Sequence, residues 1–289
     1  MVRLTSSIKD LPRDIYKALE DGADVKDEDI EAFKEGVGAL LKQSLSTTKG
    51  VAERNTLRMS NIGTQCERKL WYTVNKPDAA EKLDGKTKFK FMLGHLIEEL
   101  VVFYTRATGR KVVGTQDRME LHGVVGHRDG VIDGVLVDVK SASPQGMSKF
   151  RDHALDSDDP FGYRDQLDIY LAASRDDPLV TVKGEAAFVA VDKVSGAIVV
   201  DSYKKKGTDY EKLIEQKKSM VESEEVPKRR YFPKADGSSG NYKLGTECSY
   251  CPFKRECWPG LRTFIYSNGP RYLTTVARTP DVYEVKEQG

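Results

Sequence analysis

The stretch GHRDGVIDGVLVDVKSAS, residues 126–143, decides the fold of this chain. The dipeptide Asp133-Gly134 divides it into two short strands, because this pair tolerates positive φ and favours a tight hairpin turn. The second strand begins V-L-V-D-V-K, so three valines share one face, while Asp138 and Lys140 share the other. The sequence therefore predicts a hairpin whose register is fixed at the turn.

The polar face of this hairpin is a candidate site. Asp138 and Lys140 point the same way, and Asp129 on the partner strand can lie across from Asp138. Two neighbouring carboxylates repel each other unless a cation lies between them. For an isolated Asp-x-Lys pair the simpler interpretation is a solvated strand face with one salt bridge, since charged residues usually face water. The motifs around the hairpin decide between the two.

Length and composition set broad limits. A chain of 289 residues can bury a sizeable core, and we expect one elaborated domain rather than two small ones. The net charge is only +1 although 31% of the residues are charged, so any contact with nucleic acid must come from local patches. No apolar run approaches the length of a membrane span, and the N-terminus lacks the apolar core of a signal peptide. We therefore expect a cytoplasmic protein without membrane contact.

The order of predicted elements indicates an α/β fold with a mixed sheet. A helical segment precedes residue 59, and the segment from Pro144 to Pro160 lacks periodicity, so we expect it to be a loop. The remaining elements are defined by hydrophobic periodicity. They are helices over residues 87–108, 161–174 and 209–222, and strands near 112, over 119–121, in the hairpin, and over 186–191 and 197–203.

The cysteines form a second candidate site. Cys248, Cys251 and Cys257 lie within ten residues, and three thiolates this close need a metal ion to neutralise their charge. Cys66 is the remaining candidate for a fourth ligand. In a reducing compartment this set indicates a metal or cluster rather than disulfides. An iron–sulfur cluster tolerates a remote cysteine, whereas structural zinc sites more often use two cysteine pairs, so the spacing favours a cluster and leaves zinc open.

Two helices carry further polar candidates. Gly94, His95 and Glu98 interrupt the apolar surface of the helix over 87–108, and the glycine would let another backbone or a substrate come close. A solvated stripe is the alternative explanation for the glutamate. Gln166 and Tyr170 are four residues apart and therefore share one face of their helix.

Taken in order, these motifs resemble those of the RecB-like branch of the PD-(D/E)xK nuclease superfamily. The matching residues are Gly94 to Glu98, Asp129-Gly130, Asp138-Val139-Lys140 and Gln166-x3-Tyr170. The cysteine pattern resembles the iron–sulfur members of that branch, which include the AddB nuclease domain and the CRISPR-adaptation exonucleases, and small stand-alone phage exonucleases are also similar. The resemblance covers about residues 59–260.

The resemblance implies a restriction-endonuclease-like core with the order α-β-β-β-α-β and a mixed sheet. It implies a nuclease domain over residues 59–260. Cluster ligands would lie at both ends of that domain and form a cysteine-ligated C-terminal clasp. Residues 261–289 would be a C-terminal tail. The helical N-terminal extension over residues 1–58, predicted from hydrophobic periodicity, and the C-terminal tail lie outside the resemblance.

The activity that the resemblance implies is that of a DNA exonuclease dependent on Mg²⁺ or Mn²⁺, with a structural 4Fe-4S cluster. Glu98, Asp129, Asp138 and the carbonyl of Val139 would hold the ion. Many relatives have a histidine where this chain has Glu98, so His95 is the competing ligand, and we favour Glu98. Lys140, with its pKa lowered by the adjacent cation, would orient or deprotonate the attacking water. Gln166 and Tyr170 would hold the DNA strand or Lys140.

Partners and alternatives follow from the same resemblance. The substrate would be single strands or DNA ends, in recombination, repair or a phage setting, and a helicase or recombination protein would open duplex DNA. The alternatives are an endonuclease or processing subunit of a recombination or CRISPR-adaptation complex, and a non-catalytic DNA-binding scaffold. Basic and aromatic residues near the cysteines form a candidate DNA channel, with solvated surface as the alternative. They are Lys228, Arg229, Arg230, Lys254 and Arg255, interleaved with Tyr231, Phe232 and Trp258.

Overall fold

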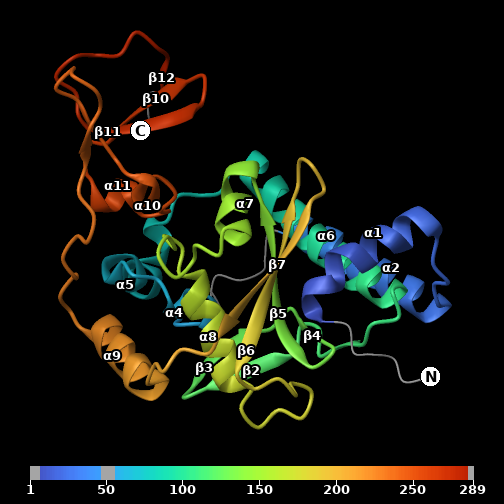
Figure 1. The fold of residues 1–289 in the computed structure, drawn as a ribbon. Coiled ribbons are helices and arrows are strands. Elements are labelled where there is room, and N and C mark those ends of the chain that lie inside the picture. The colour runs from blue at the N-terminus through green and yellow to red at the C-terminus, as the bar shows by residue number, and fades with distance from the viewer. Residues whose placement is uncertain (1–6, 47–55, 286–289) are drawn as a thin grey trace. The chain divides into compact units, whose positions relative to one another are not determined.

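The structure is a computed structural model that describes residues 7–46 and 56–285 (Figure 1). Its contacts divide the chain into two compact units. Of the described residues, the first unit contains 7–46, 58–63 and 83–214, and the second contains 56–57, 64–82 and 215–285. The predicted boundary after residue 58 follows the segment 47–55, which lies outside the described residues. The division into 1–58, 59–260 and 261–289 stays a prediction.

The first unit is built on a five-stranded mixed sheet, as predicted. Its strand order is β1-β4-β5-β6-β7, and only β5 and β6 run parallel. The strands are β1 (Val112–Val113), β4 (Gly130–Ile132), β5 (Val135–Ala142), β6 (Glu185–Asp192) and β7 (Ile198–Lys204). A separate two-stranded sheet pairs β2 (Arg118–Leu121) with β3 (Val124–His127).

The hairpin between β4 and β5 has the predicted turn. Asp133 and Gly134 have φ of 49° and 85°, both in the left-handed region. Gly130 pairs with Val137, so continuing this register by one residue places Asp129 opposite Asp138. The turn thereby places the two carboxylates at paired positions on neighbouring segments.

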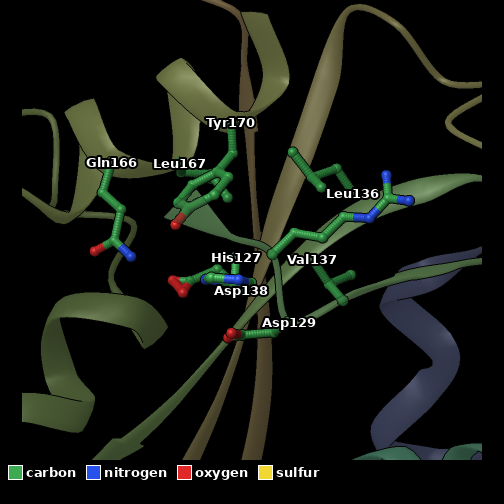
Figure 2. A pocket seen from close by; sticks show the side chains of 9 residues that line it. His127, Asp129, Leu136, Val137, Asp138, Gln166, Leu167 and Tyr170 are labelled. Atoms are coloured by element: carbon green, nitrogen blue, oxygen red, sulfur yellow. The ribbon is translucent and has the colours of Figure 1, made fainter. Parts of the chain in front are cut away.

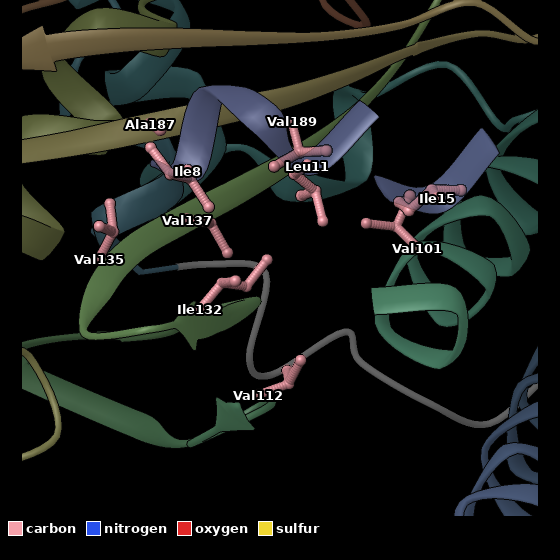
Figure 3. Close-up of a cluster of buried hydrophobic side chains, with 10 residues drawn as sticks. All are labelled: Ile8, Leu11, Ile15, Val101, Val112, Ile132, Val135, Val137, Ala187 and Val189. Atoms are coloured by element: carbon pink, nitrogen blue, oxygen red, sulfur yellow. The ribbon is translucent and has the colours of Figure 1, made fainter. Parts of the chain in front are cut away.

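One face of the sheet packs against helices from the N-terminal third of the chain (Figure 3). These are η1 (Ile8–Asp10), α1 (Leu11–Asp21) and α6 (Gly85–Ala107). The valines of β5 form this core with side chains from all three helices, which confirms the predicted apolar face. The helix α2 (Asp27–Leu45) packs along α6, where the rings of Phe33 and Phe103 lie 5.0 Å apart.

The other face of the sheet is covered by α7 (Pro144–Arg151) and α8 (Tyr163–Ala173). The prediction of a loop from Pro144 to Pro160 is wrong for its first half. Ser143 caps α7 by accepting a hydrogen bond from the Gly146 amide, and Pro144 occupies a first-turn position that needs no amide hydrogen. Met147 and Phe150 are buried one turn apart and anchor the helix to the sheet.

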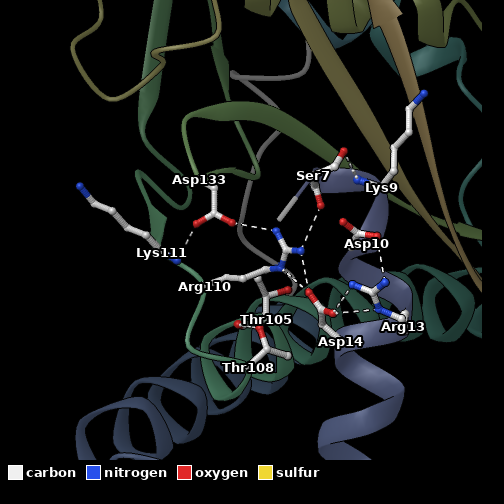
Figure 4. A network of polar contacts seen from close by, with 10 residues as sticks. All are labelled: Ser7, Lys9, Asp10, Arg13, Asp14, Thr105, Thr108, Arg110, Lys111 and Asp133. Carbon is white, nitrogen blue, oxygen red and sulfur yellow. Dashed lines mark hydrogen bonds and ion pairs between the residues drawn. The ribbon is translucent and has the colours of Figure 1, made fainter. Parts of the chain in front are cut away.

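A buried arginine ties the N-terminal helices to the hairpin turn (Figure 4). Arg110 donates to Asp14 on α1 at 2.6 Å and to Asp133 at 2.8 Å, and it also donates to the carbonyl of Ser7. Asp133 therefore does more than form the turn, since its other oxygen accepts from the Lys111 amide.

The second unit has its own core and its own sheet. Trp71 and Tyr72 on α5 (Glu67–Asn75) pack with Phe253, Cys251 and Cys257. The sheet has the order β12-β10-β11-β9-β8. Its strands are β8 (Lys234–Ala235), β9 (Tyr242–Lys243), β10 (Arg262–Tyr266), β11 (Gly269–Thr275) and β12 (Glu284–Val285). The sequence interpretation named no strand after residue 260, so this sheet was missed.

Of the remaining helices, four are short, and α9 (Tyr210–Glu222) spans the point in the sequence where the first unit ends and the second continues. The short ones are α4 (Met59–Ile62), η2 (Pro77–Ala79), α10 (Thr246–Ser249) and α11 (Lys254–Cys257). Among the described residues, we find no helix with the length and apolar character that a bilayer crossing requires.

Candidate active site

Asp138 and Lys140 form a buried ion pair on β5. The lysine Nζ lies 2.8 Å from Oδ1 and 2.6 Å from Oδ2 of the aspartate. The Lys140 side chain is 18% exposed and the Asp138 side chain is 10% exposed. The ammonium also lies 4.8 Å from the centre of the Tyr163 ring on α8. Burial lowers the pKa of Lys140, but the charges of Asp138 and Asp129 outweigh burial and raise it. In the protein by itself Lys140 is therefore a cation.

Asp129 is held directly beside this pair. Its Oδ2 accepts a hydrogen bond of 2.7 Å from the amide of Val139, which fixes the carboxylate against β5. Burial raises the pKa of Asp129 well above its ordinary value, and the charges of Asp138 and Glu98 raise it further. A carboxyl that resists ionisation for these reasons would be stabilised as an anion by a nearby cation.

Glu98 approaches Asp129 from α6. Glu98 and Asp129 both line a cavity of about 220 Å³, together with residues of α2 and α6. His95 is 65% exposed, and its Nδ1 lies 3.7 Å from Glu98. The neighbouring Glu98 carboxylate raises the pKa of His95. Of the two competing ligands, Glu98 is therefore the one that faces the cavity shared with Asp129.

Gln166 and Tyr170 on α8 complete the site (Figure 2). With Asp129 and Asp138 they line a small cavity of about 10 Å³. Burial raises the pKa of Tyr170 to about 12, with further contributions from the two aspartates. Gly126 on β3 makes room for this tyrosine, because a Cβ there would lie 2.8 Å from that of Met59 and closer still to the Tyr170 hydroxyl.

Residues that the sequence interpretation missed hold Glu98 in place. Gln116 donates from its side-chain amide to Glu98 Oε1, and its φ of 58° is unusual for a residue with a side chain. The buried Arg128 holds this loop by donating to the Gly114 carbonyl at 3.0 Å and to Asp117 at 2.5 Å. The loop between β1 and β2 thus positions a candidate metal ligand on another element.

All four cysteines belong to the second unit, and none forms a disulfide. Burial raises the pKa of the Cys248 thiol to about 12, and the charges of Cys251, Cys66 and Cys257 raise it further. Cys66 lies at the N-terminus of α5, and Cys257 ends α11. The fold therefore brings the remote cysteine within electrostatic range of the other three.

No three His, Cys, Asp or Glu side chains in residues 7–46 and 56–285 are arranged closely enough to form a finished metal site. This holds for the carboxylates and for the cysteines. The carboxylates nevertheless have the right chemistry for a hard divalent ion, because such ions bind oxygen ligands and would neutralise the mutual repulsion of the acids. The cysteine thiols likewise have the right chemistry for zinc or an iron–sulfur cluster, because both are bound by soft thiolate ligands.

Three basic residues of the predicted DNA channel have partners inside the second unit, and the channel itself stays a prediction. Lys254 is 6% exposed and forms an ion pair with Glu81. Arg255 also pairs with Glu81, at 3.1 Å. Arg229 donates to the Cys257 carbonyl at 2.6 Å and lies over the Trp258 ring. These residues support the cysteine-rich fold.

A family comparison agrees with the carboxylate site. Residues 14–258 match the family model described as the PD-(D/E)XK nuclease superfamily. The chain belongs to this superfamily. The match covers most of the chain and starts well before residue 59, where the motif resemblance begins. The protein is thus a nuclease by family, and its fold places Asp138 and Lys140 on β5 and Asp129 immediately before β4.

Two solved structures are similar to this PD-(D/E)XK nuclease. The first is the protein SSO0001, with 16% identity, a TM-score of 0.42, and coverage of 76% of this chain and 93% of the other. The second is a phage related exonuclease from Haemophilus somnus 129PT, with 14% identity, a TM-score of 0.28, and coverage of 73% and 89%. No curated protein matches.

Proposed function

We propose that this nuclease is a cytoplasmic DNA exonuclease that depends on Mg²⁺ or Mn²⁺ and acts on single strands or DNA ends. The observation that supports this most is the position of Asp129. It lines one cavity with Asp138 and a second cavity with Glu98, so it links the acids of two elements. Carboxylate oxygens are the ligands that these ions prefer, and the carbonyl of Val139 is the further ligand in this proposal. His95 stays outside the set.

The chemistry assigned to the protein's own groups follows from their positions. A bound divalent ion supplies charge neutralisation at the phosphate and makes water a better nucleophile. Lys140, fixed by Asp138, orients the attacking water as a cation; it would accept the proton of that water at Nζ only after a bound divalent ion had lowered its pKa and it had released one proton to solvent. Gln166 and Tyr170 line the cavity beside both aspartates and position the strand or the lysine.

The proposal includes a structural iron–sulfur cluster held by Cys66, Cys248, Cys251 and Cys257. It is supported by the mutual effect of the four thiols on the pKa of Cys248 and by the remote position of Cys66 in the sequence. Four thiolates also suit zinc, so metal analysis separates the two. The partners in this proposal are DNA and a helicase or recombination protein that opens duplex.

Substitution of the β5 pair tests the activity. Asp138→Ala and Lys140→Ala should each lower Mn²⁺-dependent release of nucleotides from end-labelled DNA by at least about 100-fold, because each removes a group required in the transition state. His95→Ala is the matched control and should keep most of the activity, since this side chain is exposed. Substrates labelled at either end, single- and double-stranded, also give polarity and strand preference. Wild-type rates in both variants would contradict the catalytic role of Asp138 and Lys140, whereas DNA binding without cleavage by the wild type would favour a DNA-binding scaffold.

A further inference from the structure

The first two turns of α6 expose two aromatic rings. Phe89 and Phe91 keep 59% and 56% of their surface accessible. Phenylalanine contributes to folding by leaving water, so these two rings contribute little to the stability of the unit. Their segment leads directly into Gly94 and Glu98 on the same helix. Exposed aromatic rings this close to a nuclease site are candidates for contact with the substrate.

Only one of the two rings lies on the side of the helix that carries Glu98. Phe91 precedes Glu98 by seven residues, which is two helical turns, so both lie on nearly the same stripe about 10 Å apart along the axis. Phe89 precedes Glu98 by nine residues, which places it on the opposite side. The two rings are equally exposed but differ in their relation to the active site.

The charge around Phe91 suits a nucleic acid strand. Lys86, Lys88 and Lys90 are all exposed, and no acidic residue occurs from Gly85 to Ile97. On the helix, Lys88 lies about 60° to one side of Phe91 and Lys90 about 100° to the other, so the two lysines flank the ring and can bind phosphates on either side of a stacked base. The net charge of the whole chain is only +1, so this basic segment is a local feature.

We propose that Phe91 stacks on an unpaired base of a DNA strand that enters the Glu98–Asp129 site, while Lys88 and Lys90 bind its phosphates. This inference rests on the proposed function and specifies its substrate as single-stranded DNA or an unpaired end. Stacking needs a free base face, which a base inside a duplex does not offer. It is tolerant of sequence because every base has a π-face, as a non-specific exonuclease requires.

The test compares Phe91→Ala with the matched control Phe89→Ala in the full chain. The probe is a fluorescein-labelled oligo-dT strand, with Ca²⁺ in place of the activating ion. Phe91→Ala should weaken binding by roughly fivefold to a hundredfold, the range for loss of one base–aromatic stack, and Phe89→Ala should stay near wild type. Phe91→Trp should restore affinity. In cleavage assays Phe91→Ala should raise KM on single strands with kcat nearly unchanged, because stacking is present in both ground and transition states.

Three outcomes are distinguishable. If the wild type cleaves DNA and the two alanine variants bind the probe equally, the stacking proposal is overturned and the nuclease proposal stands. If Phe91→Ala lowers the unfolding temperature more than Phe89→Ala but leaves affinity unchanged, Phe91 packs within the chain and the stacking proposal is again overturned. If the wild type cleaves no DNA with either ion, the proposed function itself fails.

Discussion

At the scale of single residues, the site depends on groups that hold the acids as much as on the acids. Gln116 donates from its side chain to Glu98, and its left-handed backbone is held by a hydrogen bond from its amide to the Arg128 carbonyl. Removing such an outer partner typically costs 10- to 100-fold in metal affinity. We expect Gln116→Ala to raise the Mg²⁺ concentration for half-maximal activity by about that factor. A titration of cleavage rate against Mg²⁺ measures it.

Backbone strain needs its own control, because a φ of 58° is energetically less favourable for alanine than for glycine. Gln116→Gly removes the same side chain without that strain. Equal Mg²⁺ dependence in the two variants would assign the effect to the lost hydrogen bond. If both variants keep the wild-type Mg²⁺ dependence, Gln116 does not position Glu98.

The sequence predicted the acids but not their support, for a physical reason. Asp138 and Lys140 follow from strand alternation, and the place of Asp129 follows from the turn at Asp133-Gly134, so both depend on local rules. Gln116 meets Glu98 only through tertiary packing, and nothing in a lone glutamine between Thr115 and Asp117 indicates a left-handed conformation. Residues placed by strand alternation and turn register can therefore be predicted from the sequence, whereas Gln116, which is placed by a loop, cannot.

At the scale of elements, the N-terminal helix is joined to the hairpin turn through Arg110. The arginine side chain is 5% exposed, and it pairs with Asp14 and Asp133. Arg110→Ala would leave both carboxylates without their main partner, so we expect the free energy of unfolding to fall by about 2 kcal/mol. Urea denaturation at pH 7 measures this. Arg13 also pairs with Asp14 at 3.2 Å but is 70% exposed, so Arg13→Ala should cost less than about 1 kcal/mol.

The same network gives a pH dependence. Burial raises the pKa of Asp14, but hydrogen bonds from Arg110 and Arg13 outweigh it, and the pKa is lowered from 3.8. A carboxyl with a lowered pKa stabilises the folded protein above its ordinary pKa, and this contribution is lost as the pH falls through the folded value. The difference between wild type and Arg110→Ala should therefore narrow below pH 3.8. A constant difference from pH 7 to pH 3 would argue against the ion pair as its source.

Two elements were missed although the sequence contains signals for them. The Ser143-Pro144 pair before α7 is a helix start, and Asn268-Gly269 is a hairpin signal at the end of the two-residue loop Ser267-Asn268 between β10 and β11. Both segments are short, so hydrophobic periodicity has few positions on which to act there. The longer α6 and α8 have enough apolar positions for periodicity to decide, and they were predicted within two residues of their observed ends.

At the scale of the whole molecule, the chain has two compact units with separate cores. The cysteines belong to only one of them, so a metal centre there should stabilise that unit. We expect the wild type to be brown and to contain iron and sulfide, and Cys251→Ser to lose both. In calorimetry Cys251→Ser should lower the unfolding temperature of one transition, and Arg110→Ala that of another, because Arg110 lies in the first unit.

Tyr250→Ala is the control for this comparison, because Tyr250 adjoins Cys251 but is 75% exposed. It should keep the metal and the wild-type transitions. The pKa of Cys248, raised to about 12, means that this thiol does not ionise at neutral pH by itself, so binding of a metal must release protons. Apoprotein reconstituted with iron and sulfide in weak buffer should therefore acidify the solution. A colourless wild type with stoichiometric zinc would show that the four cysteines form a zinc site and not an iron–sulfur cluster. A wild type that contains neither metal would contradict the proposed metal centre.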